Sequence, residues 1–166
     1  IKKDIKILSW EGFMTYPKEM KKEFPLDLEA VGILLNIDIK KEDQNFSIAN
    51  IHGFWGGGPK DDNLARLFQS RRVLEYLREK IGPKILIGDF NLRPDTDSIS
   101  MIEKEMKNLI KENKIETTRN HYYEGMEKYK DYIADYCFVS RDLEVEDFKV
   151  LPNEISDHQP LYLEFE

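Results

Sequence analysis

Apolar and polar residues alternate along several short stretches of the chain, and this period of two predicts β-strands. The first two stretches lie at 33–39 and 46–52 and flank a polar turn at 41–45, which predicts a hairpin. Further strands are predicted at 84–87, 133–140, 143–150 and 160–165. We expect these strands to supply most of the sheet.

Two other stretches repeat their apolar residues with a helical period. The first helix is predicted to begin at a cap on Asp61 or Asp62 and to end at Gly82, which precedes a proline. The second should begin at Asp97 or Ser98 and extend to 110. Glycine-rich 53–60 and polar 114–131 are expected to be loops. This order predicts a mixed α/β (α+β) fold, a layered α/β sandwich with helices packed on largely antiparallel sheets.

Composition narrows the class of protein. A chain of 166 residues is the size of one domain, here 1–166, and 40% hydrophobic with 34% charged residues is typical of a soluble globular protein. No apolar run is long enough to span a membrane. The net charge of −7 argues against a broad grip on nucleic acid but allows a local basic groove. One cysteine, Cys137, excludes an internal disulfide and favours a buried thiol, so we expect a reducing, cytoplasmic setting.

Four polar motifs lie at the edges of predicted strands. They are His52 after 46–51, Gly88-Asp89-Phe90-Asn91 after 84–87, Asp135 within 133–140, and Ser156-Asp157-His158 before 160–165. Acid, amide and imidazole groups that converge on one rim of a sheet are the groups needed for metal-assisted attack on a phosphoester. The sequence therefore predicts a hydrolytic site at this rim.

These motifs also have purely structural interpretations, and His52 could simply cap backbone groups of the loop that follows it. Asp89 and Asn91 would face the same way on an extended chain and bind a cation, but both residue types are also common in strand-end turns. On an extended chain Asp157 and His158 would point apart, so His158 needs another carboxylate, and Asp135 is the candidate because a carboxylate in an apolar strand is costly unless paired. The alternative for His158 is a half-buried structural histidine.

The remaining candidates concern substrate contacts. Trp55 beside His52 would stack on a base or sugar, although loop aromatics more often pack on their own domain. Arg119, in a Thr-Thr-Arg cluster followed by His121 and two tyrosines, is a candidate phosphate contact. A phosphate-binding loop at 56–60 is rejected because Pro59-Lys60 is the wrong chemistry. The three arginines of the first helix, Arg71, Arg72 and Arg78, are expected to form a solvated face.

In this order, the His52, Gly-Asp-Phe-Asn, Asp135 and Ser-Asp-His motifs resemble the endonuclease/exonuclease/phosphatase superfamily from about residue 33 to the end. The resemblance implies roles for five catalytic residues and for a metal site of Asp89, Asn91 and Asp157. His158 would activate water and would be oriented by Asp135. Asp89 and Asn91 would position the nucleophile. His52 would stabilise charge on the phosphate. The implied cofactor is Mg²⁺, with Mn²⁺ as an alternative.

The N-terminal part departs from the family pattern, in which a strand carrying Asn precedes a strand ending in Gln-Glu. Trp10-Glu11-Gly12 contains a Glu, but no strand–helix–strand unit is expected before it. We therefore interpret the chain as the C-terminal two thirds of such a domain. Two functions stay open: a metal-dependent phosphoesterase, with a nuclease acting on DNA or RNA favoured over lipid or sugar phosphates, and a catalytically incomplete half-domain that binds a partner. The sequence leaves the oligomeric state open.

Overall fold

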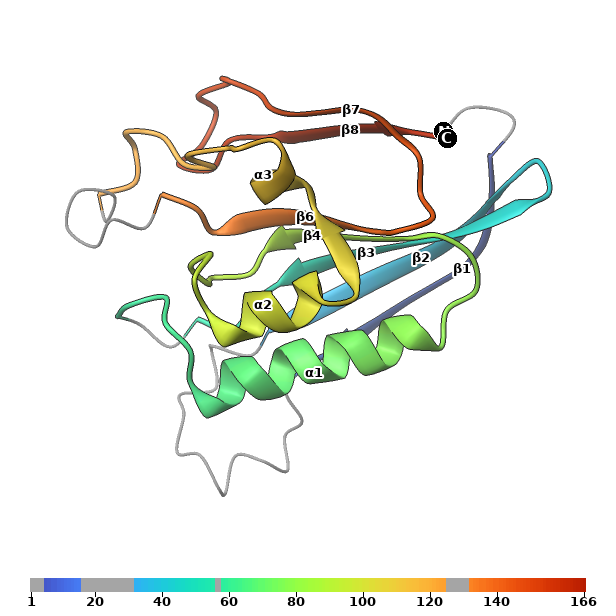
Figure 1. Cartoon of the computed structure of the whole chain (residues 1–166), viewed down its shortest axis with the longest axis horizontal. Helices are drawn as coiled ribbons and strands as arrows, with labels where there is room; N and C mark the ends of the chain where they lie inside the picture. Colours follow the sequence, from blue (N-terminus) through green and yellow to red (C-terminus); the bar gives the residue numbers. More distant parts are fainter. Residues whose placement is uncertain (1–4, 16–31, 56–57, 125–131) are drawn as a thin grey trace.

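The computed structural model describes residues 5–15, 32–55, 58–124 and 132–166 (Figure 1). Within these ranges the first sheet contains six strands in the order β1-β2-β3-β4-β6-β5. The six strands are β1 (Ile5–Met14), β2 (Ile33–Lys41), β3 (Gln44–His52), β4 (Lys84–Asp89), β5 (Met106–Asn108) and β6 (Asp135–Ser140). Of the pairs in this sheet only β3 and β4 run parallel, so the predicted largely antiparallel α/β architecture is confirmed.

A second, two-stranded sheet is formed by β7 (Val145–Val150) and β8 (Leu161–Phe165). Figure 1 shows the large sheet between this pair on one side and α1 (Leu64–Arg78) with α2 (Asp97–Glu103) on the other. The side of β3 that faces the second sheet carries Phe46, whose ring lies 5.6 Å from that of Phe165. The layers are therefore helix, sheet and sheet.

Helix α1 makes the crossover between the parallel strands β3 and β4, as parallel neighbours require. Its N-cap is Asn63, whose side chain accepts a hydrogen bond from the Arg66 amide, and not Asp61 or Asp62 as predicted. These two carboxylates bind elsewhere, because Asp61 pairs with Arg93 and Asp62 accepts hydrogen bonds at the start of α2. The predicted stop at Gly82 lies four residues after the helix, at a φ of 83°.

The predicted single helix from 97 to 110 is wrong. The chain forms α2, then β5, then the short α3 (Leu109–Glu112), and α2 is capped by Thr96. Residues 106–108 pair with β6, and the side chain of Asn108 caps α3. Apolar residues at helical spacing here serve two helices and an edge strand, because tertiary pairing overrides the local period.

Strand β1 was not expected from the sequence. Nearly all of its residues are exposed on both faces, so it lacks the alternating pattern of a half-buried strand. It pairs with β2 along its length and forms one edge of the sheet within the described residues. Of the predicted 114–131 loop, the described residues 114–124 form no helix or strand and have one isolated bridge, from Arg119 to His158. Residues 125–131 lie outside the described ranges.

The main core lies between the large sheet and the helices. Its fully buried side chains come from the helix-facing positions of the strands and from α1 and α2, among them Leu34, Ala49, Val73, Leu86 and Ile99. The thiol of Cys137 is buried as predicted, and burial raises its pKa to about 12. None of the helices in the described ranges is long and apolar enough to cross a membrane.

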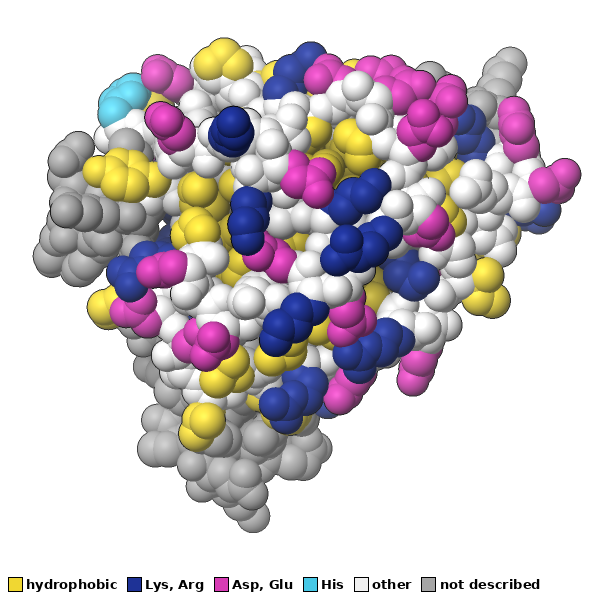
Figure 2. Space-filling model, viewed as in Figure 1, with side chains coloured by type: hydrophobic (Ala, Val, Ile, Leu, Met, Phe, Trp, Pro, Cys, Tyr) yellow, Lys and Arg dark blue, Asp and Glu magenta, His cyan; other side chains and the backbone are white. Residues whose placement is uncertain are grey.

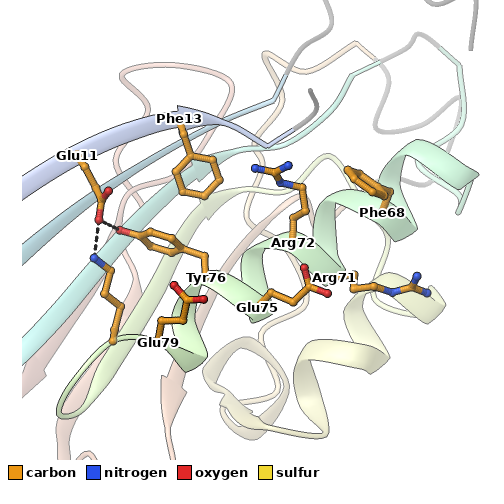
Figure 3. A pocket seen from close by; sticks show the side chains of 9 residues that line it. Glu11, Phe13, Phe68, Arg71, Arg72, Glu75, Tyr76 and Glu79 are labelled. Atoms are coloured by element: carbon orange, nitrogen blue, oxygen red, sulfur yellow. Dashed lines mark hydrogen bonds and ion pairs between the residues drawn. The ribbon is translucent and has the colours of Figure 1, made fainter. Parts of the chain in front are cut away.

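Charged residues of both signs are interspersed on the face that Figure 2 shows. Arg78 is exposed and pairs with Glu105, as a solvated helix face predicts. Arg71 and Arg72 instead line an open groove of about 830 Å³ between α1 and β1 (Figure 3). Across this groove Tyr76 and Lys80 both donate hydrogen bonds to Glu11 of β1, which fastens the edge strand to the helix side.

Candidate active site

Three strands bring polar side chains into one row at the edge of the large sheet. His52 is the register partner of Asp89 on parallel β3 and β4, and Asp89 is the register partner of Asp135 on antiparallel β4 and β6. Side chains of paired residues project from the same face of a sheet. His52 and Asp89 end their strands and Asp135 begins its strand, so the row lies on the rim that the sequence predicted.

Two glycines allow the strand ends to approach closely. The Gly53 amide donates a 2.6 Å hydrogen bond to the Asp89 carbonyl, and a Cβ on Gly53 would lie 2.2 Å from the carbonyl oxygen of Phe90. Gly88 has a φ of 133°, and a Cβ there would lie 2.1 Å from the Ile51 carbonyl oxygen. The backbone therefore fixes the spacing of His52 and Asp89 before any side chain contributes.

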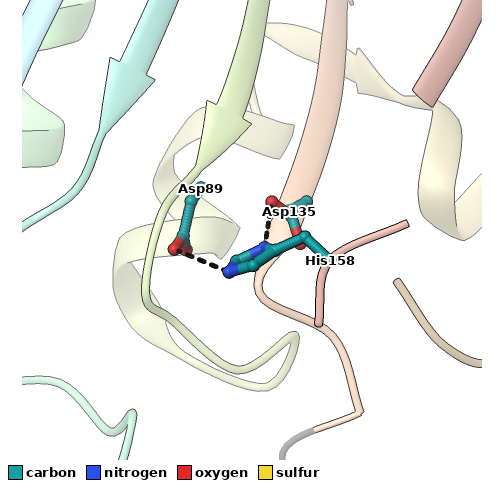
Figure 4. A group of neighbouring side chains, drawn as sticks. All are labelled: Asp89, Asp135 and His158. Carbon is teal, nitrogen blue, oxygen red and sulfur yellow. Dashed lines mark hydrogen bonds and ion pairs between the residues drawn. The ribbon is translucent and has the colours of Figure 1, made fainter. Parts of the chain in front are cut away.

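His158 joins the row from the segment before β8. Its Nδ1 lies 2.9 Å from both carboxylate oxygens of Asp135, and its Nε2 lies 3.8 Å from Asp89 Oδ2 (Figure 4). The hydrogen bond to Asp135 raises the pKa of His158, and burial offsets part of this rise. The predicted pairing of His158 with Asp135 is thus present, and it leaves Nε2 facing the second carboxylate.

Thr118 orients the carboxylate of this pair. Its hydroxyl donates to Asp135 Oδ2 at 2.9 Å and accepts from the amides of Ala134 and Asp135 at 3.2 Å. Thr118 is completely buried. The sequence had marked the Thr-Thr-Arg cluster as a phosphate contact, but this supporting role of Thr118 was missed because it depends on a neighbour 17 residues away.

The sequence suggested that Asp89 and Asn91 point the same way from an extended chain, and the structure differs from this expectation. Asn91 adopts a left-handed φ of 52°, which Asn tolerates better than most residues. Its amide donates to Asp89 Oδ1 at 2.8 Å and its side-chain nitrogen donates to the Gly53 carbonyl at 3.3 Å. Burial, and to a smaller extent the charge of Asp135, raise the pKa of Asp89 and so disfavour its ionised form. A bound cation would offset this effect and favour the carboxylate.

Asp157 also differs from expectation. Its Oδ2 accepts a 2.8 Å hydrogen bond from Arg119 Nη1 and lies 3.9 Å from His158 Nε2. The two neighbouring side chains converge because residues 155–157 form a bend and not an extended strand. Arg119 is almost fully buried, and its Nη2 lies 3.9 Å from Asp89 Oδ2.

His52 and Trp55 complete the predicted set. Both side chains are exposed, Trp55 with 56% of its surface, and the His52 ring makes no hydrogen bond to a residue in the described ranges. The structure therefore places His52 in the row beside Asp89 but leaves Trp55 on the adjoining loop.

Lys60 is a site residue that the sequence analysis set aside. Its side chain is buried, its Nζ lies 5.2 Å from the centre of the Tyr123 ring, and its charge opposes the rise that burial causes in the pKa of Asp89. Nothing in a Gly-Pro-Lys sequence indicates such burial, because it depends on contacts with residues distant in sequence. One of these is the hydrogen bond that the Arg93 amide donates to the Lys60 carbonyl.

Among the described residues, Asp89, Asp135 and His158 form a group that could hold a metal ion, each with one ligand atom within 4.8 Å of the others. Asp135 already binds His158 and Thr118. Asp89 offers a carboxylate whose ionisation a cation would favour, and Mg²⁺ commonly uses one or two carboxylates together with water and substrate phosphate. The group therefore fits a hard divalent cation, with Asp89 as one carboxylate ligand.

Solved structures with the same fold have little sequence identity to this chain. An endonuclease/exonuclease/phosphatase from Bacteroides vulgatus has a TM-score of 0.73 at 20% identity, with 99% of this chain and 67% of that chain covered. The Bacteroides thetaiotaomicron mannosyl-6-phosphatase Bt3783 gives 0.71 at 22%, with 99% and 68% covered. D. rerio TDP2 complexed with single strand DNA product gives 0.68 at 15%, with 99% and 70% covered.

The chain thus spans about two thirds of the length of these structures. No curated protein matches its sequence. The sequence profile described as Endonuclease/Exonuclease/phosphatase family matches residues 11–158, which include every residue of the rim. On this match, the chain belongs to the endonuclease/exonuclease/phosphatase family.

Proposed function

We propose that the chain carries the catalytic rim of a metal-dependent phosphoesterase that hydrolyses its substrate with an activated water. The observation that carries this proposal is His158, whose Nδ1 is held 2.9 Å from Asp135 while Nε2 faces Asp89 at 3.8 Å. An imidazole fixed in this way has one nitrogen committed to a carboxylate and the other available for proton transfer.

His158 takes the role of general base in this proposal. With Nδ1 donating to Asp135, the neutral ring has its lone pair on Nε2, and a water hydrogen-bonded to Nε2 would also be in reach of Asp89. His158 accepts the water's proton as the water oxygen attacks phosphorus, and Asp135 stabilises the resulting imidazolium. The P–O bond to the leaving group breaks in the same displacement, the leaving oxygen takes a proton from solvent, and the imidazolium then returns its proton to solvent. His52, exposed beside Asp89, contributes a donor to the phosphoryl oxygens.

A divalent cation, Mg²⁺ or Mn²⁺, supplies Lewis-acid polarisation of the phosphoryl group when bound. We assign Asp89 to hold it, with Asn91 fixing the Asp89 carboxylate through its amide. The family pattern adds Asn91 and Asp157 to the metal-binding groups. Residues 1–166 would act as one domain that corresponds to the C-terminal two thirds of the family's domain.

For the substrate class we favour a nucleic-acid phosphodiester over lipid or sugar phosphates. Exposed Trp55 next to the row offers a surface on which a base or sugar can stack. The net charge of −7 limits the contact to a few nucleotides, because longer sites depend on many Lys and Arg contacts to phosphates. The structural likenesses include a sugar phosphatase and a DNA complex, and so favour neither substrate.

The test compares hydrolysis of single-stranded DNA, single-stranded RNA, phosphoinositide, sphingomyelin and a sugar phosphate in Mg²⁺. His158→Ala should lower turnover by about 10²- to 10⁴-fold, the contribution of a well-placed general base. His121→Ala is the matched control, since His121 is exposed and its nearest ion-pair partner is Glu154 at 3.5 Å. Turnover that survives His158→Ala unchanged would overturn the mechanism.

A catalytically incomplete half-domain is the second candidate. The observation that favours it is the coverage of about two thirds of the similar structures. In that case the chain would bind one of these substrates without turning over any of them in Mg²⁺ or Mn²⁺. Turnover by the 166-residue chain alone would exclude this candidate.

A further inference from the structure

The most unusual group near the rim is the guanidinium of Arg119, a residue with only 4% of its surface exposed to solvent. Nη1 donates to Asp157 Oδ2 at 2.8 Å and Nη2 lies 3.9 Å from Asp89 Oδ2. Nε is buried and has no hydrogen-bond partner among the described residues. A buried charge with one direct ion pair is costly, so its retention here calls for a role beyond packing.

Backbone contacts fix the position of Arg119 relative to His158. The two residues form an antiparallel bridge, the Gln159 amide donates to the Thr118 carbonyl at 2.8 Å, and the Asn120 amide donates to the Asp157 carbonyl at 3.3 Å. The guanidinium also lies 4.1 Å from the centre of the Tyr123 ring, a cation–π geometry. Arg119 therefore has little freedom to leave the carboxylates.

Arg119 contributes a positive charge beside two of the carboxylates of the site. Asp157 and Asp89 each have an oxygen within 4 Å of His158 Nε2, at 3.9 Å and 3.8 Å, so both carboxylates border the same small space. A cation beside both carboxylates reduces their mutual repulsion, and Arg119 supplies this charge permanently.

We propose that Arg119 is a built-in cation that occupies the space a second divalent ion would take between Asp157 and Asp89. The site then accepts one metal ion, at Asp89. Asp157, which the family pattern counts among the metal-binding groups, acts in this chain as the partner of Arg119 and not as a metal ligand. Arg119 is in this sense a positioning residue, since it acts on the reaction through the two carboxylates. This inference rests on the proposed function of the same site.

Metal binding without substrate tests the idea, with Mn²⁺ alone followed by calorimetry and by its electron paramagnetic resonance signal. The wild-type chain should bind at most one Mn²⁺ at the rim. Arg119→Gln should bind Mn²⁺ about tenfold or more tightly, or gain a second ion, because it frees the Asp157 carboxylate. Arg119→Lys, which keeps the charge, should stay close to wild type. Unchanged or weaker binding by a folded Arg119→Gln would overturn the proposal.

Asp157→Asn tests the same point from the other partner of the pair, because its side-chain oxygen can still accept the hydrogen bond from Arg119 Nη1. If Asp157 is committed to Arg119, this variant should leave Mn²⁺ affinity within about twofold of wild type, whereas loss of a metal ligand typically costs at least 10- to 100-fold. Such a loss would refute the inference. In the double variant Arg119→Gln/Asp157→Asn, the gain from Arg119→Gln should disappear.

Arg78→Gln is the matched control, because it removes an arginine–carboxylate pair with Glu105 on the exposed helix face. It should leave Mn²⁺ binding unchanged. The binding measurement separates this inference from the proposed hydrolysis. If Mn²⁺ binds as expected but no phosphoester is hydrolysed, the inference about Arg119 stands and the proposed function is refuted. If a phosphoester is hydrolysed but Mn²⁺ binding does not respond to Arg119→Gln, the proposed function stands and the inference is refuted.

Discussion

Asp89 and Asp135 are direct register partners on antiparallel strands β4 and β6, so two carboxylates project side by side from one face of the sheet. Their surroundings differ. Asp135 binds the His158 imidazole and the Thr118 hydroxyl, while Asp89 accepts the Asn91 amide and lies in a buried position that raises its pKa. In the proposed mechanism, Asp135 orients the imidazole and Asp89 holds the cation, and their pairing in the β-ladder brings the two carboxylates together.

The Thr118 hydroxyl should be essential to this arrangement. Thr118→Val removes the donor to Asp135 and leaves the amides of Ala134 and Asp135 without their acceptor in a buried place. An unsatisfied buried group costs about 1–3 kcal/mol, so urea denaturation should show a loss of that size or more. Thr118→Ser keeps the hydroxyl and is the control. Equal stability of the two variants would contradict the network.

Gly53 should tolerate no side chain. In Gly53→Ala the new Cβ would meet backbone atoms of Phe90 at 2.2 Å, and backbone cannot move aside as a side-chain tip can. Overpacking costs about 1–3 kcal/mol, and displacement here moves Asp89 with it. We expect a lower melting temperature and a loss of hydrolysis. Gly12→Ala, whose Cβ would have ordinary contacts at 3.6 Å and 3.7 Å, should behave as wild type.

The attachment of β1 should weaken in acid. The hydrogen bond from Lys80, followed by that from Tyr76, lowers the pKa of Glu11. A carboxylate with a lowered folded-state pKa stabilises the fold above its unfolded-state pKa, and this contribution is lost as the pH falls through the folded-state value. Melting temperatures measured between pH 7 and 3 should therefore converge for wild type and Glu11→Gln at the acid end. The difference at pH 7 should be small, because Glu11 is half exposed.

The elements that the sequence predicted well are those whose pattern reflects local burial. The β2–β3 hairpin and β6 have alternating or continuous apolar residues that match their burial, and both were predicted. Edge strand β1 has no buried face to produce such a pattern, and β5 is short and defined by pairing with β6. Those two strands depend on tertiary partners that a local period does not record.

Some features of the candidate site could likewise be predicted from local sequence, and others could not. The pairing of Asp135 with His158 followed from the cost of an isolated carboxylate in an apolar strand. The burial of Lys60 and the pairing of Arg119 with Asp157 did not follow, because each depends on how two loops pack together. The left-handed turn at Asn91 was open to prediction from its residue type, but the extended alternative was equally compatible with the sequence.

The face of β1 and β2 opposite α1 should cause self-association of the isolated chain. Trp10, Ile33 and Leu35 share this face and expose 74%, 53% and 51% of their surfaces, while the β7–β8 sheet covers the part near Phe46. Contiguous exposed apolar residues beside an edge strand favour association. Sedimentation velocity should show oligomers whose fraction rises with concentration and falls in Ile33→Ser/Leu35→Ser. Leu64→Ser, which changes a residue 65% exposed on α1, is the control and should leave association unchanged. A wild-type chain that is monomeric at high concentration would show that this apolar face is tolerated in water, and the double variant would then change nothing.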